Sequence, residues 1–96
     1  MRPSEVLPKH RETIRQLVAE AGMANPRVFG SVLHGEDTEE SDLDILVDPA
    51  PKTSLLDVAG LQMEIEKVVG IHVDLLTPRA LPMKFRAKVL SEAQPV

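Results

Sequence analysis

The chain has 96 residues, 11 basic and 15 acidic side chains, and no cysteine. Without cysteine it can form neither a disulfide scaffold nor a thiolate metal site. No apolar stretch approaches the roughly 20 residues that span a bilayer, and the polar first residues do not resemble a secretory signal. We therefore expect a single cytoplasmic domain over residues 1–96, without a membrane partner.

Charge and aromatic content both disfavour direct nucleic-acid binding. The net charge is −4, whereas tight binders of DNA or RNA usually present a basic surface. Only 2% of residues are aromatic, which leaves few rings to stack on bases. Basic side chains do gather near the end of the chain, where they could contact phosphates or an acidic partner. A solvated helix face is the simpler interpretation of these four residues: Arg79, Lys84, Arg86 and Lys88.

The first part of the chain predicts a helix. Apolar residues between Leu7 and Ala21 recur at helical spacing, and Gly22 follows where a C-terminal cap belongs. Because Pro8 has no N–H group to donate, we expect the regular helix to begin near it.

Two short strands should follow, separated by a polar loop. Residues 27–29 form a short segment, apolar at Val28 and Phe29, that is extended in character and ends at Gly30. We expect a short helix from Ser31 and then a solvated loop over the acidic residues 35–40. In residues 42–47 aspartates and apolar side chains alternate, which predicts a strand with one polar and one buried face.

The second half predicts a helix, a strand and a last helix. Ser54 and Asp57 resemble a capping box that opens a helix, and Gly70 would end it. Residues 71–76 alternate like a third strand, and residues 81–89 suit a closing helix. This order predicts an α/β fold of the α+β type, in which helices flank a small mixed sheet of about three or more strands.

The pair Gly30-Ser31 is a candidate phosphate-binding turn. A glycine after a strand permits a tight turn and a close approach of the backbone. Free N–H groups at the start of a helix attract anions, and the serine hydroxyl adds another donor. Taken alone, such a pair is more often a plain turn.

Three aspartates are candidate metal ligands. Asp42 and Asp44 are two residues apart on a strand, so their side chains point to the same face. Paired carboxylates suit Mg²⁺, which is commonly held by one or two of them together with substrate phosphates. Asp74 stands inside an apolar strand, where a carboxylate is costly unless it is paired or metal-bound. Taken singly, these residues could equally belong to a solvated strand face or an exposed edge.

The combination of these features resembles the nucleotidyltransferase superfamily that includes DNA polymerase beta. It is most similar to the small branch called minimal nucleotidyltransferases. The resemblance rests on residues 28–35, with the Gly-Ser turn, on residues 41–47, with the Asp-x-Asp pair, and on residues 73–75. It extends over most of the chain.

The resemblance implies a role for each residue. Asp42, Asp44 and Asp74 would be catalytic and would bind magnesium, with two ions expected, and Asp74 could also help to activate the attacking hydroxyl. Gly30 and Ser31 would bind the triphosphate of ATP. Members of this branch often act as antitoxins beside a HEPN-domain ribonuclease toxin, and some transfer AMP from ATP to a tyrosine of that toxin. A hetero-oligomer with such a partner is therefore expected.

Two alternatives remain at this point. The chain could neutralise its partner by binding and masking it, without catalysis. It could also modify a small molecule or tRNA, although recognition would then require a further domain. Two histidines near the motifs, His34 and His72, could touch a phosphate or tune the site, but exposed positions are the simpler interpretation.

Overall fold

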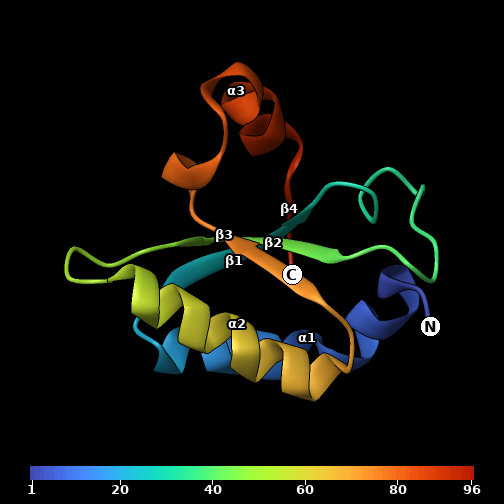
Figure 1. Cartoon of the computed structure of the whole chain (residues 1–96), viewed down its shortest axis with the longest axis horizontal. Helices are drawn as coiled ribbons and strands as arrows, with labels where there is room; N and C mark the ends of the chain where they lie inside the picture. Colours follow the sequence, from blue (N-terminus) through green and yellow to red (C-terminus); the bar gives the residue numbers. More distant parts are fainter.

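The computed structural model describes all residues 1–96, with a four-stranded sheet that carries helices on both faces (Figure 1). The strand order is β3-β2-β1-β4, with β2 and β3 parallel and the other neighbours antiparallel. The predicted mixed sheet flanked by helices is confirmed, and β4 is a short edge strand that the sequence pattern did not indicate. In chain order the elements are α1 (Pro3–Glu20), β1 (Ala24–Phe29), β2 (Leu43–Asp48), α2 (Leu55–Val69), β3 (Val73–Leu76), the 3₁₀ helix η1 (Pro78–Ala80), α3 (Met83–Glu92) and β4 (Gln94–Pro95).

Helix α1 begins at Pro3, so the expected start near Pro8 is wrong. The N–H group of Ser4 donates to Asp37 Oδ2 at 2.9 Å, which satisfies one of the donors that a helix start leaves free. The same bond is the main reason why the pKa of Asp37 lies below its usual value. Asp37 is also buried. The sequence predicted a solvated loop over residues 35–40, and this prediction is wrong at Asp37.

The segment around the first strand also departs from expectation. Strand β1 starts at Ala24, and its pairing with β2 is irregular between Ala24 and Arg27. The short helix predicted from Ser31 does not form. The residues that follow Ser31 make only a short series of turns. One hydrogen bond of helical span is present, from the N–H of His34 to the carbonyl of Gly30 at 3.3 Å.

Helix α2 begins with the predicted capping box and ends at Gly70. Two of its polar side chains reach the outer edge of β3: Gln62 Oε1 accepts the N–H of Leu75 at 3.2 Å, and Glu66 Oε2 accepts the N–H of Val73 at 3.0 Å. These bonds occupy backbone donors that an edge strand would otherwise expose.

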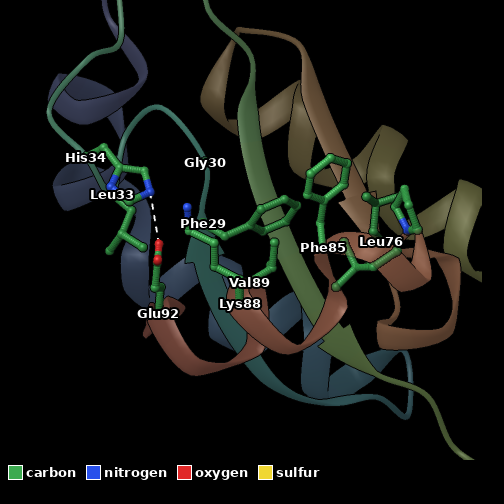
Figure 2. A pocket seen from close by; sticks show the side chains of 11 residues that line it. Phe29, Gly30, Leu33, His34, Leu76, Phe85, Lys88, Val89 and Glu92 are labelled. Carbon is green, nitrogen blue, oxygen red and sulfur yellow. Dashed lines mark ion pairs between the residues drawn. The ribbon is translucent and has the colours of Figure 1, made fainter.

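Helix α3 lies on the face of the sheet opposite α1 and α2 (Figure 1). None of its residues is buried. The guanidinium of Arg86 donates to the carbonyls of Arg79 and Leu81 at 3.1 and 3.0 Å, which ties α3 to η1. Between α3 and the sheet a pocket remains open (Figure 2).

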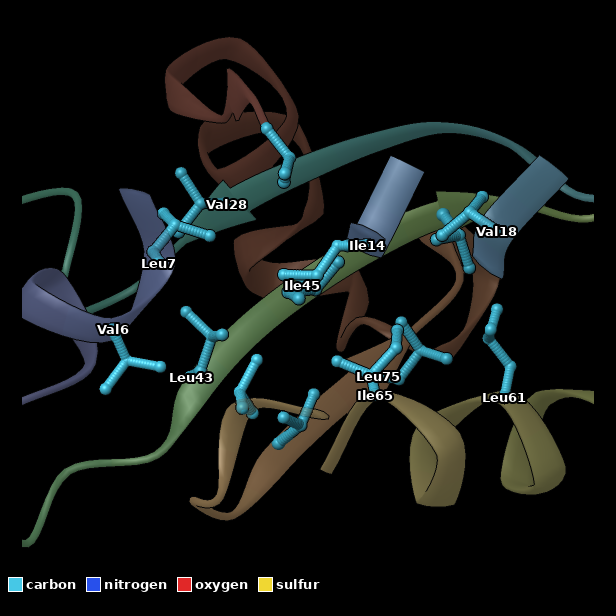
Figure 3. Close-up of a cluster of buried hydrophobic side chains, with 14 of the residues drawn as sticks. Val6, Leu7, Ile14, Val18, Val28, Leu43, Ile45, Leu61, Ile65 and Leu75 are labelled. Atoms are coloured by element: carbon cyan, nitrogen blue, oxygen red, sulfur yellow. The ribbon is translucent and has the colours of Figure 1, made fainter. Parts of the chain in front are cut away.

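The hydrophobic core fills the space between the sheet and the pair α1 and α2 (Figure 3). Ile14 from α1, Ile45 from β2 and Ile65 from α2 are completely buried in it. Because side chains alternate along a strand, burying Ile45 here turns Asp44 to the other face. We call these the core face and the site face of the sheet. None of the helices combines the length and the apolar composition that a membrane crossing requires.

Candidate active site

Three carboxylates lie at one end of two neighbouring strands on the site face. In the parallel register of β2 and β3, Asp44 lies directly opposite Asp74. Asp42 precedes β2 and shares the face of Asp44 by alternation. The Asp44 side chain is partly buried, whereas Asp42 and Asp74 are exposed. The structure thus brings together the three acids that the sequence singled out, and we call them the acidic triad.

Asp44 is the electrostatic centre of the triad. Burial, and to a smaller extent the negative charges of Asp74 and Asp42, together raise the pKa of Asp44 to about 6, while His72 opposes the change. At neutral pH three carboxylates therefore repel one another at this point. A bound cation would remove that repulsion.

Gly30 lies against Asp44 at the end of β1. It has a φ of +77°, and a methyl group built on it would overlap the Asp44 carboxylate. Only glycine combines this left-handed backbone with so close an approach. Phe29, the residue before it, pairs with Asp44 across the antiparallel strands. The turn that begins at Gly30, directly after β1, and the acidic triad therefore form one continuous surface.

The turn after Gly30 presents unpaired donors. No acceptor is found for the backbone N–H groups of Ser31, Val32 and Leu33, and the Ser31 hydroxyl also has no partner. Although the expected helix is missing, the bond from His34 to Gly30 keeps the segment in a single turn. We call residues 30–34 the phosphate turn, because clustered free N–H groups bind anions.

His72 connects the triad to helix α2. Its Nδ1 lies 3.1 Å from Asp42 Oδ1, and its Nε2 lies 3.7 Å from Glu66 Oε2. Glu66 is itself fixed by the N–H of Val73. The sequence suggested at most a tuning role for His72 and gave no role to Glu66. Only the fold brings α2 to the edge of β3.

A pocket of about 400 Å³ adjoins the phosphate turn under α3 (Figure 2). His34 Nε2 lies 3.1 Å from Glu92 Oε2, which links the turn to the last residues of α3. No sequence pattern predicted this pocket. The one sequence feature that could have indicated it is that the chain has only two aromatic residues, Phe29 and Phe85. Both of them line the pocket.

The donor set of the triad suits a hard divalent cation. As the side chains stand, no three acidic or histidine residues are arranged to hold a metal ion by themselves. Magnesium sites commonly use one or two carboxylates and take further oxygen ligands from substrate phosphates. The pair Asp44 and Asp74, beside a turn with free N–H groups, fits that kind of site.

The family comparison covers nearly the whole chain. The model of the family described as "Polymerase beta, Nucleotidyltransferase" matches residues 12–96. Protein adenylyltransferase MntA of Thermococcus cleftensis is 36% identical over 87 residues, covering 91% of this chain and 85% of the relative. The Methanocaldococcus jannaschii protein MJ0435, provisionally named a protein adenylyltransferase, is 35% identical over 83 residues, covering 86% and 89%.

Solved structures give the same result for the fold. A structure provisionally described as a minimal nucleotidyltransferase is 42% identical, with a TM-score of 0.86 over 97% of this chain and 95% of that one. A second structure holds a tri-AMPylated HEPN toxin of Shewanella oneidensis in complex with an MNT antitoxin. It is 18% identical with a TM-score of 0.69, and the match covers 92% of this chain and 69% of that one. At that identity the second likeness shows the fold alone.

Proposed function

This chain belongs to the polymerase beta family of nucleotidyltransferases, and from that premise we propose that it is a magnesium-dependent protein adenylyltransferase. Its reaction would transfer AMP from ATP to a hydroxyl of a partner protein and release pyrophosphate. The observation that carries this proposal is the pairing of Asp44 with Asp74 beside the phosphate turn. There, carboxylates for a cation and donors for phosphates lie within one surface.

The residues would divide the work as follows. The free N–H groups of the phosphate turn would bind the triphosphate, and Gly30 would let it approach Asp44. Asp42 and Asp44 would hold magnesium, with Asp74 as the third ligand. Asp74 would also accept the proton of the attacking hydroxyl. When bound, one or two magnesium ions would neutralise charge on the attacking and leaving oxygens.

The electrostatics of Asp44 support a cation-dependent site. Its pKa of about 6 reflects burial next to Asp74 and Asp42. Such crowding costs stability unless a positive charge compensates it, so its presence in a marginally stable small protein favours a functional origin.

We further propose that the acceptor is a tyrosine of a HEPN ribonuclease toxin and that the chain is the antitoxin in that complex. Named relatives are protein adenylyltransferases, and a distant protein of the same fold is an MNT antitoxin bound to an AMPylated HEPN toxin. The chain contains no tyrosine. A tyrosine acceptor would therefore lie outside these 96 residues, and we place it in a partner protein that forms a hetero-oligomer with the chain.

The proposal is tested by incubating the protein with labelled ATP, magnesium and the helical protein encoded in an adjacent reading frame. We expect label on the partner with the wild type and none with the double variant Asp42→Asn/Asp44→Asn. Asp48→Asn is the matched control, because Asp48 lies on the same strand and face but pairs with Arg27 at 3.1 Å.

Two results would contradict the proposal. If the double variant still neutralised the partner and no label were transferred by the wild type, masking would be the mechanism. If label appeared on RNA or a small molecule instead of the partner, the acceptor class would be wrong.

A further inference from the structure

We infer that the outer side of α2 is a docking surface for a partner protein that presents an amphipathic helix rich in lysine or arginine. The surface includes a groove lined by Glu20 and Ala21 at the end of α1 and by residues of α2 between Leu56 and Glu64. We call it the α2 groove. Helices α1 and α2 lie on the side of the sheet opposite α3 (Figure 1), so the groove is remote from the site face. The inference therefore goes beyond the proposed function and does not depend on it.

Helix α2 has a second apolar face, which the fold leaves uncovered. Its first apolar face is buried in the core. On the outer side, Leu56 is 84% exposed and Met63 is 59% exposed, and Ala59 and Gly60 are exposed between them. Apolar or small residues at positions i, i+3, i+4 and i+7 form the kind of face that packs against another helix. This spacing favours a helix as the missing neighbour of α2.

Gly60 indicates a close contact at the centre of that face. Glycine inside a helix is less stable than alanine or glutamine, because it loses more backbone entropy on folding. Nothing within the chain requires it, since a methyl group built on Gly60 would meet no atom within 4 Å. Gly60 also lines the groove, which has a volume of about 420 Å³. A helix of another molecule could cross α2 closely here, because the distance between two packed helices depends on the side chains at their contact.

The charges of the groove specify the kind of partner. Glu20, Asp57 and Glu64 line it, and no basic residue does. None of these three carboxylates takes part in an ion pair. Asp57 accepts the N–H of Ser54 in the capping box, which leaves its negative charge in place. Lysine or arginine side chains beside the apolar face of a partner helix would complement these charges.

The same charges disfavour a second copy of this chain as the occupant. In a symmetric dimer formed through this face, each groove would meet the identical groove of the other copy. The carboxylates of both copies would then lie close together around one apolar contact, where they would repel one another. A cationic helix of a different protein fits both the spacing of the apolar residues and the charge.

The ligands for the test are two synthetic helical peptides of about 18 residues, a length that permits helix formation. The first has leucines on one face and lysines on both flanks, and the second has glutamate at every lysine position. Fluorescence anisotropy of the labelled peptides, titrated with protein, gives the affinities. The variants are Leu56→Ser and Gly60→Gln. Met83→Ser is the matched control, because Met83 is 83% exposed and belongs to α3 on the other side of the sheet.

We expect the wild type to bind the lysine peptide roughly tenfold or more tightly than the glutamate peptide. Leu56→Ser should weaken binding of the lysine peptide roughly tenfold, as the loss of one buried leucine side chain does. Gly60→Gln should weaken it at least as much while the melting temperature rises, because glutamine is the better helix former. That combination separates a blocked groove from an unfolded protein. Met83→Ser should leave the affinity unchanged.

Reversing the charge of the groove provides a second measurement. The double variant Glu20→Lys/Glu64→Lys should bind the glutamate peptide more tightly than the lysine peptide. The inference is overturned if the wild type binds neither peptide or both equally, or if the two α2 variants bind like Met83→Ser. It is also overturned if sedimentation velocity shows a wild-type dimer that Gly60→Gln abolishes, because a second copy would then occupy the groove. None of these substitutions lies in the acidic triad or the phosphate turn, so each of these results leaves the proposed AMP transfer standing.

Discussion

The two faces of the sheet differ in almost every physical respect. On the core face, α1 and α2 pack against the strands and enclose a cluster of 15 buried apolar residues (Figure 3). On the site face, α3 contributes no buried residue, Leu46 and Leu81 are the buried apolar side chains outside that cluster, and three carboxylates and an open pocket occupy much of the surface. The same strands serve both faces, because Ile45 and its neighbour Asp44 point in opposite directions.

This contrast teaches where stability and function are placed in a small protein. A chain of 96 residues can bury only a small apolar core, so its stability is limited. Crowded carboxylates lower that stability further. We therefore expect substitutions on the core face to change stability, and substitutions on the site face to change nucleotide chemistry. The following predictions test that separation, from the largest expected effect to the smallest.

The largest effect is expected for Asp44→Asn. Loss of one charge from the acidic triad should lower the rate of AMP transfer on the order of 10³-fold, because a metal site contributes several kcal/mol to stabilisation of the transition state. The protein should nevertheless remain folded. Single-turnover transfer of labelled AMP measures the rate, with Asp48→Asn as the control that keeps it. Equal losses in the two variants would show that any change in strand charge has this effect.

Truncation of the core should cost stability without touching the site directly. Ile45 is 0% exposed, so Ile45→Ala should lower the free energy of unfolding by about 2–5 kcal/mol. Leu90 on α3 is 39% exposed, and Leu90→Ala should change it by less than about 0.5 kcal/mol. Urea titration of both variants gives the comparison. A cost for Leu90→Ala as large as that for Ile45→Ala would mean that α3 is part of the core.

Two glycines with the same backbone conformation should separate strain from function. Gly30 and Gly35 have φ values of +77° and +69°, so alanine at either position should cost about 1–2 kcal/mol of stability. A methyl group at Gly30 would displace the Asp44 carboxylate, whereas at Gly35 it would meet open space. We expect Gly30→Ala alone to lose about 10²-fold in transfer rate, as a small misplacement of a reacting group does. Matched rates in the two variants would contradict the contact.

The smallest effect concerns stability as a function of pH. In the folded protein the pKa of Asp44 is raised from 3.8 to about 6, mainly by burial. Its stability contribution is therefore complete below pH 3.8 and is lost as the pH rises through 6. Without divalent metal, Asp44→Asn should melt at the same temperature as the wild type at pH 4. At pH 7.5 it should be more stable by about 1 kcal/mol after allowance for solvent screening, or about 4–8 °C. If the difference in melting temperature between Asp44→Asn and the wild type did not change with pH, the raised pKa of Asp44 would not be its cause.

Local pattern was sufficient to predict much of this architecture. Alternation in residues 42–47 placed Asp42 and Asp44 on one face, and the capping box at Ser54 marked the start of α2 correctly. These features depend on residues close together in the sequence. The mixed sheet also followed from the order of elements.

Most of the misses involve contact between distant residues. The start of α1 was placed too late, at Pro8, whereas Glu5 accepts the N–H of Arg2 and Asp37, far along the chain, accepts the N–H of Ser4. The pocket under α3 is lined by Phe29 from β1 together with Phe85 from α3, and no periodicity of the sequence reports that arrangement. Likewise, alternation could not set the parallel register that places Asp44 opposite Asp74.

The central claim is that metal and nucleotide bind on the site face, between the acidic triad and the phosphate turn. Adding Mn²⁺ with ATP to isotopically labelled protein tests it most directly, because a bound paramagnetic ion broadens the amide signals near it. The account predicts that the signals of Gly30, Ser31, Asp44 and Asp74 disappear first, while those of Leu61 and Ile65 on the core side persist. Broadening centred elsewhere, or spread evenly over the chain, would contradict it.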